Sequence, residues 1–173
     1  GKKRSALLAL HEMFRDGGGG GRGADKRYQV LVSGRWMDPV RNVRVPLLKY
    51  LQPSGERRVR VSEAGKASHT VFRLLARWEH FSLLEAHLKT GRTHQIRVHL
   101  ASLGHPILGD RVYGRRAPAP RKPELREFLD GFGRIALHAR DLGFDHPVTG
   151  VRQRFSSPAP TSFLRLMELL RED

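Results

Sequence analysis

Cysteine is absent from the 173 residues, which excludes disulfide bonds and thiolate metal sites from this chain. Long apolar runs are also absent, so no segment reaches the length that crosses a membrane. The first residues are charged and lack the apolar core of a signal peptide. These absences favour a cytoplasmic protein that works in a reducing compartment and has no membrane partner.

Acidic residues are scarce in this chain. It has 17 Asp and Glu against 32 Lys and Arg, which gives a formal net charge of +15 at pH 7. Because the arginines are scattered along the whole chain, the excess belongs to the domain itself rather than to a basic tail. A solubility surface is one explanation, but an excess of this size favours a polyanionic partner.

The most informative stretch is Leu88–Pro106. It follows an alternating segment, 81–88, that predicts a half-buried strand ending at a glycine turn. Thr93 is a candidate cap for a helix that begins at His94, and Gly104 ends that helix. Three apolar residues at helical spacing form its buried stripe: Ile96, Leu100 and Leu103.

The neighbouring face of this helix carries His94, Arg97 and Ala101, with Arg92 just before the first turn. Two cations and a helix N-terminus beside a short side chain predict an anion site with room for a flat ligand. The alternative is an ordinary solvated face of an amphipathic helix. The residues of this stretch alone leave both interpretations open.

Several other kinds of site are excluded or weak. His94 and His99 are five residues apart and share no helix face, and no paired carboxylates accompany them, so we expect no metal site. There is no P-loop and no G-x-S-x-G sequence. The glycine-rich stretch 17–23 matches G-x-G-x-x-G, but no strand precedes it, and it is better interpreted as part of a flexible linker over 17–25.

One resemblance is specific. The segments Thr90–His99 and Leu103–Asp110, followed by Tyr113-Gly114, closely resemble the signature of the RluA-type pseudouridine synthases. Leu137–Ala139 and Phe144–Pro147 resemble the closing strands of the same family. The resemblance implies isomerisation of specific uridines to pseudouridine in RNA, without a cofactor, by a protein that we expect to be monomeric. It is strongest to the ribosomal branch, which implies large-subunit ribosomal RNA as the substrate, with transfer RNA left open.

The resemblance also implies roles for individual residues. Arg97 matches the arginine that holds the family's reacting aspartate, a role that suits the fork of a guanidinium. Tyr28 matches the aromatic residue that packs on the target base. Asp110 matches a residue that is structural rather than nucleophilic. Six further residues are expected to bind RNA: Lys89, Arg92, His94, Arg111, Arg115 and Arg116.

The sequence departs from the family pattern in one respect. The family's aspartate lies in a His-Arg-Leu-Asp sequence followed by Thr-Ser-Gly, and these 173 residues contain neither. The stretch Lys2–Ala6 resembles the family's residues just after that segment, so we expect most of a catalytic domain without its N-terminal part, inactive by itself. The alternatives are a truncated homologue that serves as a non-catalytic RNA-binding module or ribosome-assembly factor, and, less favoured, a DNA-binding protein without a recognisable motif.

The predicted fold is α+β, the pseudouridine synthase fold: a mixed, mainly antiparallel sheet with flanking helices in a single domain, 1–173. Predicted strands cover 27–36, 47–60 as two short strands around a turn, 67–77, 80–88, 134–139, 142–147 and 151–155. Predicted helices cover 2–15, 94–103 and 124–130, with a last one after Thr161, and 37–46 is expected to be a loop. Short connections between strands favour antiparallel pairing.

Overall fold

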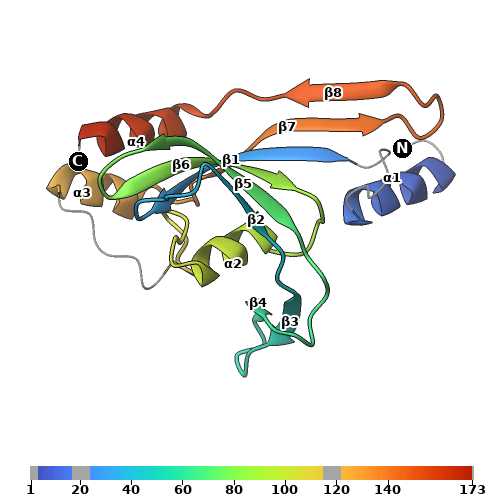
Figure 1. The fold of residues 1–173 in the computed structure, drawn as a ribbon, viewed down its shortest axis with the longest axis horizontal. Helices are drawn as coiled ribbons and strands as arrows, with labels where there is room; N and C mark the ends of the chain where they lie inside the picture. The colour runs from blue at the N-terminus through green and yellow to red at the C-terminus, as the bar shows by residue number, and fades with distance from the viewer. Residues whose placement is uncertain (1–3, 17–23, 115–121, 173) are drawn as a thin grey trace.

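A computed structural model describes residues 4–16, 24–114 and 122–172 of the chain. The fold is α+β, as predicted, with one large sheet, one small sheet and helices packed around them (Figure 1). The described residues form four helices: α1 (Arg4–Asp16), α2 (Gln95–Ser102), α3 (Pro123–Gly131) and α4 (Thr161–Glu172). None of the helices in the described ranges is long and apolar enough to cross a membrane.

The large sheet has six strands, and each neighbouring pair is antiparallel. Their spatial order is β2 (Val40–Val43), β5 (Thr70–Arg77), β6 (Phe81–Leu88), β1 (Asp25–Ser33), β7 (Leu137–Asp145) and β8 (Arg152–Ser156). The small sheet is a hairpin of β3 (Leu47–Leu51) and β4 (Arg57–Val61), which lies below α2 in Figure 1. The hairpin and α2 therefore lie on the same side of the large sheet.

The centre of the large sheet is buried on both faces. In β6 the first six residues are all buried, so both alternating sets of side chains are covered. Ile96 and Leu100 of α2 pack into the core from one side, and Phe163 and Leu166 of α4 belong to the same core. Ser82 and Glu85 are buried there together with the apolar residues of β6, and this close-packed core gives α2 a rigid support.

Two predictions about the strands differ from the structure. The expected loop 37–46 contains the edge strand β2, whose side chains are mostly exposed and so lack an apolar alternation. The two strands expected at 134–139 and 142–147 are one strand, β7. A register shift opposite Arg27 and Tyr28 places Arg140 in a bulge, which interrupts the apolar pattern without ending the strand.

The predicted linker 17–25 is tested only in part. Residues 17–23 lie outside the described ranges, and Asp25 already belongs to β1.

The first strand, β1, ends at Ser33, earlier than the predicted Trp36, because Gly34 turns the chain with a φ of 89°. Trp36 instead lies in the core beside Phe72, with ring centroids 5.6 Å apart.

A second, small core joins the hairpin to α2. Its buried members are Leu47 and Val59 from the hairpin and Val98 from α2, and Tyr113 packs against them. This cluster is separate from the main core under the large sheet. The hairpin is therefore held against α2 by a few side chains, and the candidate site lies at this junction.

Candidate active site

The helix that carries the predicted site begins with an unusual backbone. His94 is the N-cap of α2 and lies in the left-handed region, with φ 52° and ψ 21°, and no side chain caps the helix. The predicted Thr93 cap is therefore wrong, and Thr93 is exposed. A positive φ at a residue other than glycine is uncommon, and it indicates that the surrounding contacts determine this turn.

Gln95 provides the contacts that fix the turn. Its side-chain carbonyl oxygen accepts hydrogen bonds from the Arg92 amide (3.0 Å) and the Thr90 hydroxyl (2.8 Å). Its side-chain nitrogen donates to the His69 carbonyl (3.0 Å) and to the Thr70 hydroxyl (2.9 Å). Because Gln95 is buried, these bonds attach the start of α2 firmly to the start of β5.

His99 continues this buried polar layer one turn further along α2. Its Nε2 lies 2.8 Å from the Ser68 hydroxyl, which itself donates to the Val45 carbonyl, so Nε2 carries the proton. Its Nδ1 lies 3.0 Å from the Thr70 hydroxyl and accepts from it. Burial lowers the pKa of His99 to about 4. The layer is therefore built around a neutral imidazole.

This neutral histidine predicts a pH-dependent stability. The unfolded chain binds a proton to His99 below pH ~6.5, whereas the folded chain binds it only near pH 4. Stability should therefore fall as the pH drops from about 6.5 to 4, by up to about 3 kcal/mol from this residue. Urea unfolding across that pH range should give a shallower dependence for His99→Gln than for the original protein. His11→Gln, at an exposed position of α1, should keep the original dependence, and equal slopes for all three proteins would contradict the assignment.

Arg97 makes the strongest polar contact of the site. Its Nε and Nη2 each lie 2.8 Å from a different carboxylate oxygen of Asp110, in a bidentate pair. The Asp110 side chain is 1% exposed and that of Arg97 is 16% exposed. Burial alone would raise the pKa of Asp110, but the hydrogen bonds from Arg97 and two backbone amides lower it further than burial raises it. Both groups are therefore charged, and Arg97 is held in one orientation.

The turn after Asp110 wraps around its carboxylate. The amides of Val112 and Tyr113 donate to Oδ1 at 3.0 and 3.1 Å. Three of the four donors to Asp110 lie on Oδ1 and one on Oδ2, so the Asp110 carboxylate serves to hold Arg97 and the turn in this structure. The Tyr113 ring lies against Arg97, 4.9 Å from the guanidinium carbon. The aromatic partner of Arg97 in this structure is thus Tyr113, which the sequence did not single out.

His94 is part of the same cluster but is not a cation. Its Nδ1 lies 3.0 Å from the Tyr113 hydroxyl. Burial lowers the pKa of His94, and the positive charge of Arg97 lowers it further. His94 is therefore neutral at pH 7 and accepts a hydrogen bond from Tyr113. Its predicted contact with RNA would be that of a neutral ring.

The basic residues near the site gather between the hairpin and α2. Two adjacent cavities of about 380 and 510 Å³ open there. Their cationic lining residues are Lys49, Arg57, Arg58, Lys66 and Arg92, and His94 lines the larger one. The Arg92 side chain is oriented by a bond from Nε to the Ala67 carbonyl (3.1 Å). The structure thus brings Arg92 and His94 together with hairpin cations that the sequence analysis did not assign.

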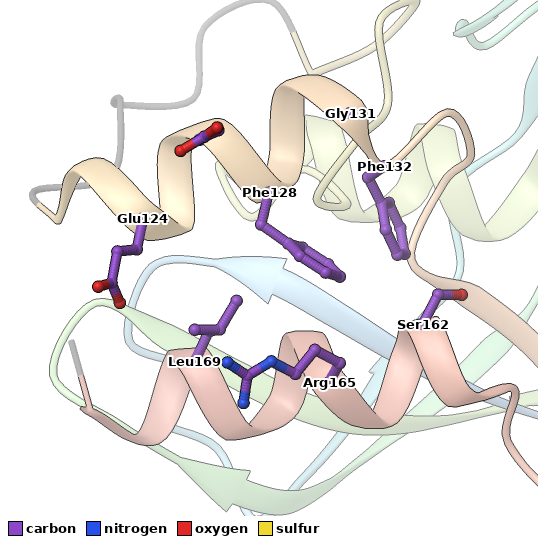
Figure 2. A pocket seen from close by; sticks show the side chains of 8 residues that line it. Glu124, Phe128, Gly131, Phe132, Ser162, Arg165 and Leu169 are labelled. Carbon is purple, nitrogen blue, oxygen red and sulfur yellow. The ribbon is translucent and has the colours of Figure 1, made fainter.

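The hollow between α3 and α4 has a different character. Figure 2 shows Phe128 of α3, and Phe132 just after this helix, facing Arg165 and Leu169 of α4. Glu124 and Glu127 also line it. The Arg165 guanidinium lies 3.0 Å from a Glu168 carboxylate oxygen, which balances its charge. This hollow is poorly suited to phosphate.

Arg111 lies near the end of α3, with Nη2 3.4 Å from the Asp130 carbonyl.

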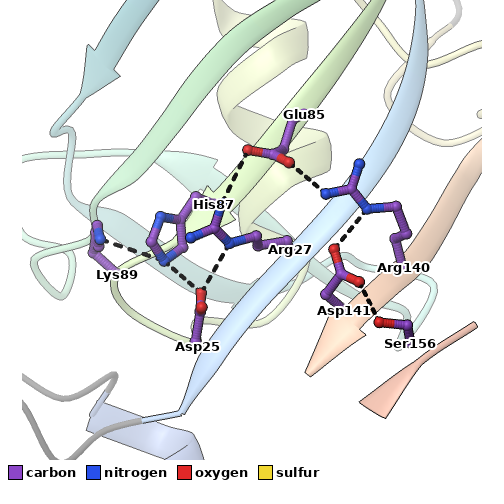
Figure 3. A network of polar contacts seen from close by, with 8 residues as sticks. All are labelled: Asp25, Arg27, Glu85, His87, Lys89, Arg140, Asp141 and Ser156. Carbon is purple, nitrogen blue, oxygen red and sulfur yellow. Dashed lines mark hydrogen bonds and ion pairs between the residues drawn. The ribbon is translucent and has the colours of Figure 1, made fainter. Parts of the chain in front are cut away.

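Lys89 lies in a network of polar contacts across the large sheet (Figure 3). Its Nζ is 3.3 Å from Nε2 of His87, which is 2.9 Å from Asp25. The network continues through Arg27, Glu85, Arg140 and Asp141 to Ser156. Carboxylates alternate with cations along it, so this surface is largely neutral. The structure does not place Lys89 in the cavities beside α2.

Tyr28 lies in the middle of the large sheet. It pairs with Ala86 of β6 and Ala139 of β7, is half-buried and packs against the main core. Burial raises the pKa of its hydroxyl, so the ring is neutral.

Two of the predicted RNA contacts, Arg115 and Arg116, lie outside the described residues. Within the described ranges, no group of three or more His, Asp or Glu side chains is placed to hold a metal ion.

Known proteins resemble this chain over nearly its whole length. A family model described as RNA pseudouridylate synthase matches residues 1–102. Ribosomal large subunit pseudouridine synthase C of Salmonella typhi and that of Escherichia coli K12 are each 44% identical over 170 residues, 98% of this chain and 51% of the relative. The protein of the same name from Pasteurella multocida is 42% identical over 171 residues, 99% of this chain and 49% of the relative. The chain therefore spans about half the length of these curated relatives.

Two solved human structures share the fold. RNA Pseudouridylate Synthase Domain Containing 1 matches with a TM-score of 0.66 at 24% identity, over 90% of this chain and 59% of that one. RNA Pseudouridylate Synthase Domain Containing 4 matches with a TM-score of 0.65 at 24% identity, over 86% of this chain and 62% of that one. At this identity the likeness concerns the fold, and it confirms the predicted fold class.

Proposed function

Because the chain belongs to the RNA pseudouridylate synthase family, we propose that the complete protein converts specific uridines into pseudouridine in large-subunit ribosomal RNA. The observation that carries this proposal is the 44% identity, over 98% of the chain, to relatives named as ribosomal large subunit enzymes. The basic character of the chain supports an RNA substrate.

The reaction breaks the bond between the sugar and N1 of uracil, turns the base and joins C5 to the sugar, and it needs no cofactor. It needs an ionised carboxylate held by a cation, and a surface against which a flipped base can stack. These 173 residues contain no His-Arg-Leu-Asp sequence, so the proposal places the reacting carboxylate outside them. The chain alone would then bind RNA without converting it.

Arg97 is the proposed partner of that carboxylate. Asp110 engages Nε and Nη2, and within the described part of the chain Nη1 has no hydrogen-bond partner. A guanidinium anchored on one side can hold a second anion on the other without reorganising, which favours catalysis. Tyr28 is the proposed platform for the base. The role of Arg97 rests on the family resemblance together with this geometry, and the role of Tyr28 rests on the resemblance alone.

The proposed phosphate contacts centre on Arg92 and the neighbouring hairpin cations. They line two adjacent hollows beside the start of α2, where an RNA strand would lie near the helix that carries Arg97. Arg111, Arg115 and Arg116 are proposed as further phosphate contacts on the family resemblance alone. Lys89 remains a proposed contact outside this group, because it lies in the ion-pair network of the large sheet.

A tritium-release assay tests the proposed activity. Uridine labelled at C5 loses its label when C5 becomes the glycosidic carbon, so incubation of labelled large-subunit ribosomal RNA with the complete protein should release tritium. Labelled transfer RNA serves as the comparison substrate. Release from transfer RNA alone would overturn the substrate assignment, and tight binding without release from either RNA would favour a non-catalytic RNA-binding module.

RNA affinity should fall steeply with salt, because each neutralised phosphate releases counterions. Arg92→Gln should lower the slope of log affinity against log salt concentration by about 1. Arg165→Gln is the matched control, because Arg165 lies on α4 and pairs with Glu168, and its slope should equal that of the original protein. Fluorescence anisotropy with a labelled RNA measures all three slopes. A flat response of the original protein, or no change in Arg92→Gln, would count against the phosphate contact.

Two general properties belong to the same proposal. The complete protein is proposed to act in the cytoplasm, since the absence of cysteine suits a reducing compartment. It is also proposed to act as a monomer, which light scattering of the purified protein would measure directly.

A further inference from the structure

The hairpin β3–β4 lies beside the site but belongs to neither the large sheet nor the main core. Its own packing cluster contains only Leu47, Val59 and Val98 as buried members. A hollow of about 660 Å³ lies between β4 and α2, with Ala101 and Ser102 along its helical side. Packing therefore leaves space between the hairpin and the helix, and polar contacts supplement the small core in setting their relative position.

Tyr113 makes those contacts through one hydroxyl group. The hydroxyl oxygen accepts a hydrogen bond from the Val59 amide of β4 at 3.1 Å. The same hydroxyl donates to Nδ1 of His94, at 3.0 Å, at the start of α2. The hairpin and the left-handed turn are therefore joined by two consecutive hydrogen bonds that share one atom.

The ring and the backbone amide of Tyr113 contact the Arg97–Asp110 pair. Its ring lies against the Arg97 guanidinium at 4.9 Å, and its amide donates to Asp110 at 3.1 Å. Arg58 of β4 adds a second link, with Nη1 3.4 Å from the Val112 carbonyl. Any displacement of β4 thus acts on the turn that holds Asp110 and, through it, on Arg97.

We propose that Tyr113 is a positioning residue that couples the placement of the β3–β4 hairpin to the orientation of His94 and Arg97. RNA seated against the hairpin would thereby fix the guanidinium that holds the reacting carboxylate. The reaction step rests on the proposed function, whereas the coupling itself concerns contacts within this chain. Tyr113 touches neither RNA nor the reacting atoms in this proposal and acts through its two neighbours.

Tyr113→Phe in the complete protein isolates the coupling. It removes the shared hydroxyl but keeps the ring against Arg97 and the packing of the small core. The Val59 amide should exchange its hydrogen roughly tenfold faster, as expected for the loss of one hydrogen bond. The Val98 amide, which donates to the His94 carbonyl at 2.9 Å, should also exchange faster because His94 loses its anchor. NMR-detected hydrogen exchange measures the exchange rates of both amides.

Turnover provides the second readout. The kcat of Tyr113→Phe should fall roughly tenfold while the KM for RNA stays within about twofold, because the phosphate contacts are unchanged. Tyr50→Phe is the matched control. It removes a hydroxyl from the same hairpin, where the Tyr50 ring contacts Arg60 at 5.1 Å, and it should leave the Val59 and Val98 exchange rates unchanged.

The outcomes separate the coupling from the proposed activity. Faster exchange at Val59 alone, or a rise in KM with kcat unchanged, would overturn the coupling, because Tyr113 would then only anchor the hairpin. Unchanged exchange at both amides would overturn it as well. If the complete protein releases no tritium but both amides exchange faster in Tyr113→Phe, the coupling stands and the proposed function fails.

Discussion

Arg97→Ala in the complete protein should reduce pseudouridine formation by roughly 10²–10³-fold while RNA affinity changes by less than about threefold. The reason is that Arg97 is held by Asp110 in a bidentate pair and is proposed to hold the reacting carboxylate rather than a phosphate. Single-turnover tritium release measures the rate, and anisotropy with the same RNA measures the affinity.

Two variants make this result interpretable. Arg97→Lys keeps the positive charge but loses the planar fork, so it should recover only a small part of the rate. Arg165→Ala, on the far helix α4, should retain the full rate, because its guanidinium pairs with Glu168. Should Arg97→Ala lose affinity by the same factor as activity, Arg97 would be a phosphate contact instead.

Asp110→Ala should lower the free energy of unfolding of the protein by about 3–5 kcal/mol. The substitution leaves the mostly buried Arg97 guanidinium without its carboxylate, and the amides of Val112 and Tyr113 without their acceptor. Urea unfolding at pH 7 gives the difference. Asp38→Ala is the matched control, because Asp38 and Arg41 form an exposed pair at 3.2 Å, and its cost should stay below about 1 kcal/mol.

The Asp110 result has an internal check. The pKa of Asp110 is lowered in the folded state, so its stabilising contribution is present above its unfolded pKa and is lost as the pH falls through the folded value. The effect of Asp110→Ala should therefore shrink in strong acid. In a cycle with Arg97→Ala, the two effects should be far from additive. A loss below about 1 kcal/mol at pH 7 would mean that the pair is not the anchor of this turn.

Much of the fold was visible in the sequence, because its elements are regular where they are buried. The alternation and apolar content of 67–88 predicted β5 and β6 as a hairpin, and the structure confirms this pair. The position of Arg97 on the helix after that hairpin was also predicted. Elements at the edge were missed for the opposite reason: β2 is almost fully exposed and has no apolar signal.

The junction at the site could not be predicted from local patterns. The left-handed conformation of His94 depends on four hydrogen bonds of Gln95 to residues from different segments, and no helix-start rule contains them. Tyr113 lies 16 positions after Arg97 in the sequence, so their contact arises only when the turn at Asp110 folds back. The sequence did offer one signal for this contact. The spacing Asp110-x-x-Tyr113 within the recognised motif places an aromatic ring three residues after a carboxylate.

Under the proposed function, the acidic hollow between α3 and α4 bears on how RNA would approach the protein. Helix α3 carries Glu124, Glu127 and Asp130 against a single Arg126, whereas the hairpin beside α2 carries an excess of cations. Among the described residues, this asymmetry makes the hairpin more positive than α3. An approaching polyanion experiences a torque before contact and turns the hairpin side toward itself. Encounters would therefore begin in the productive orientation more often than chance allows, and added salt would weaken this guidance by shortening its range.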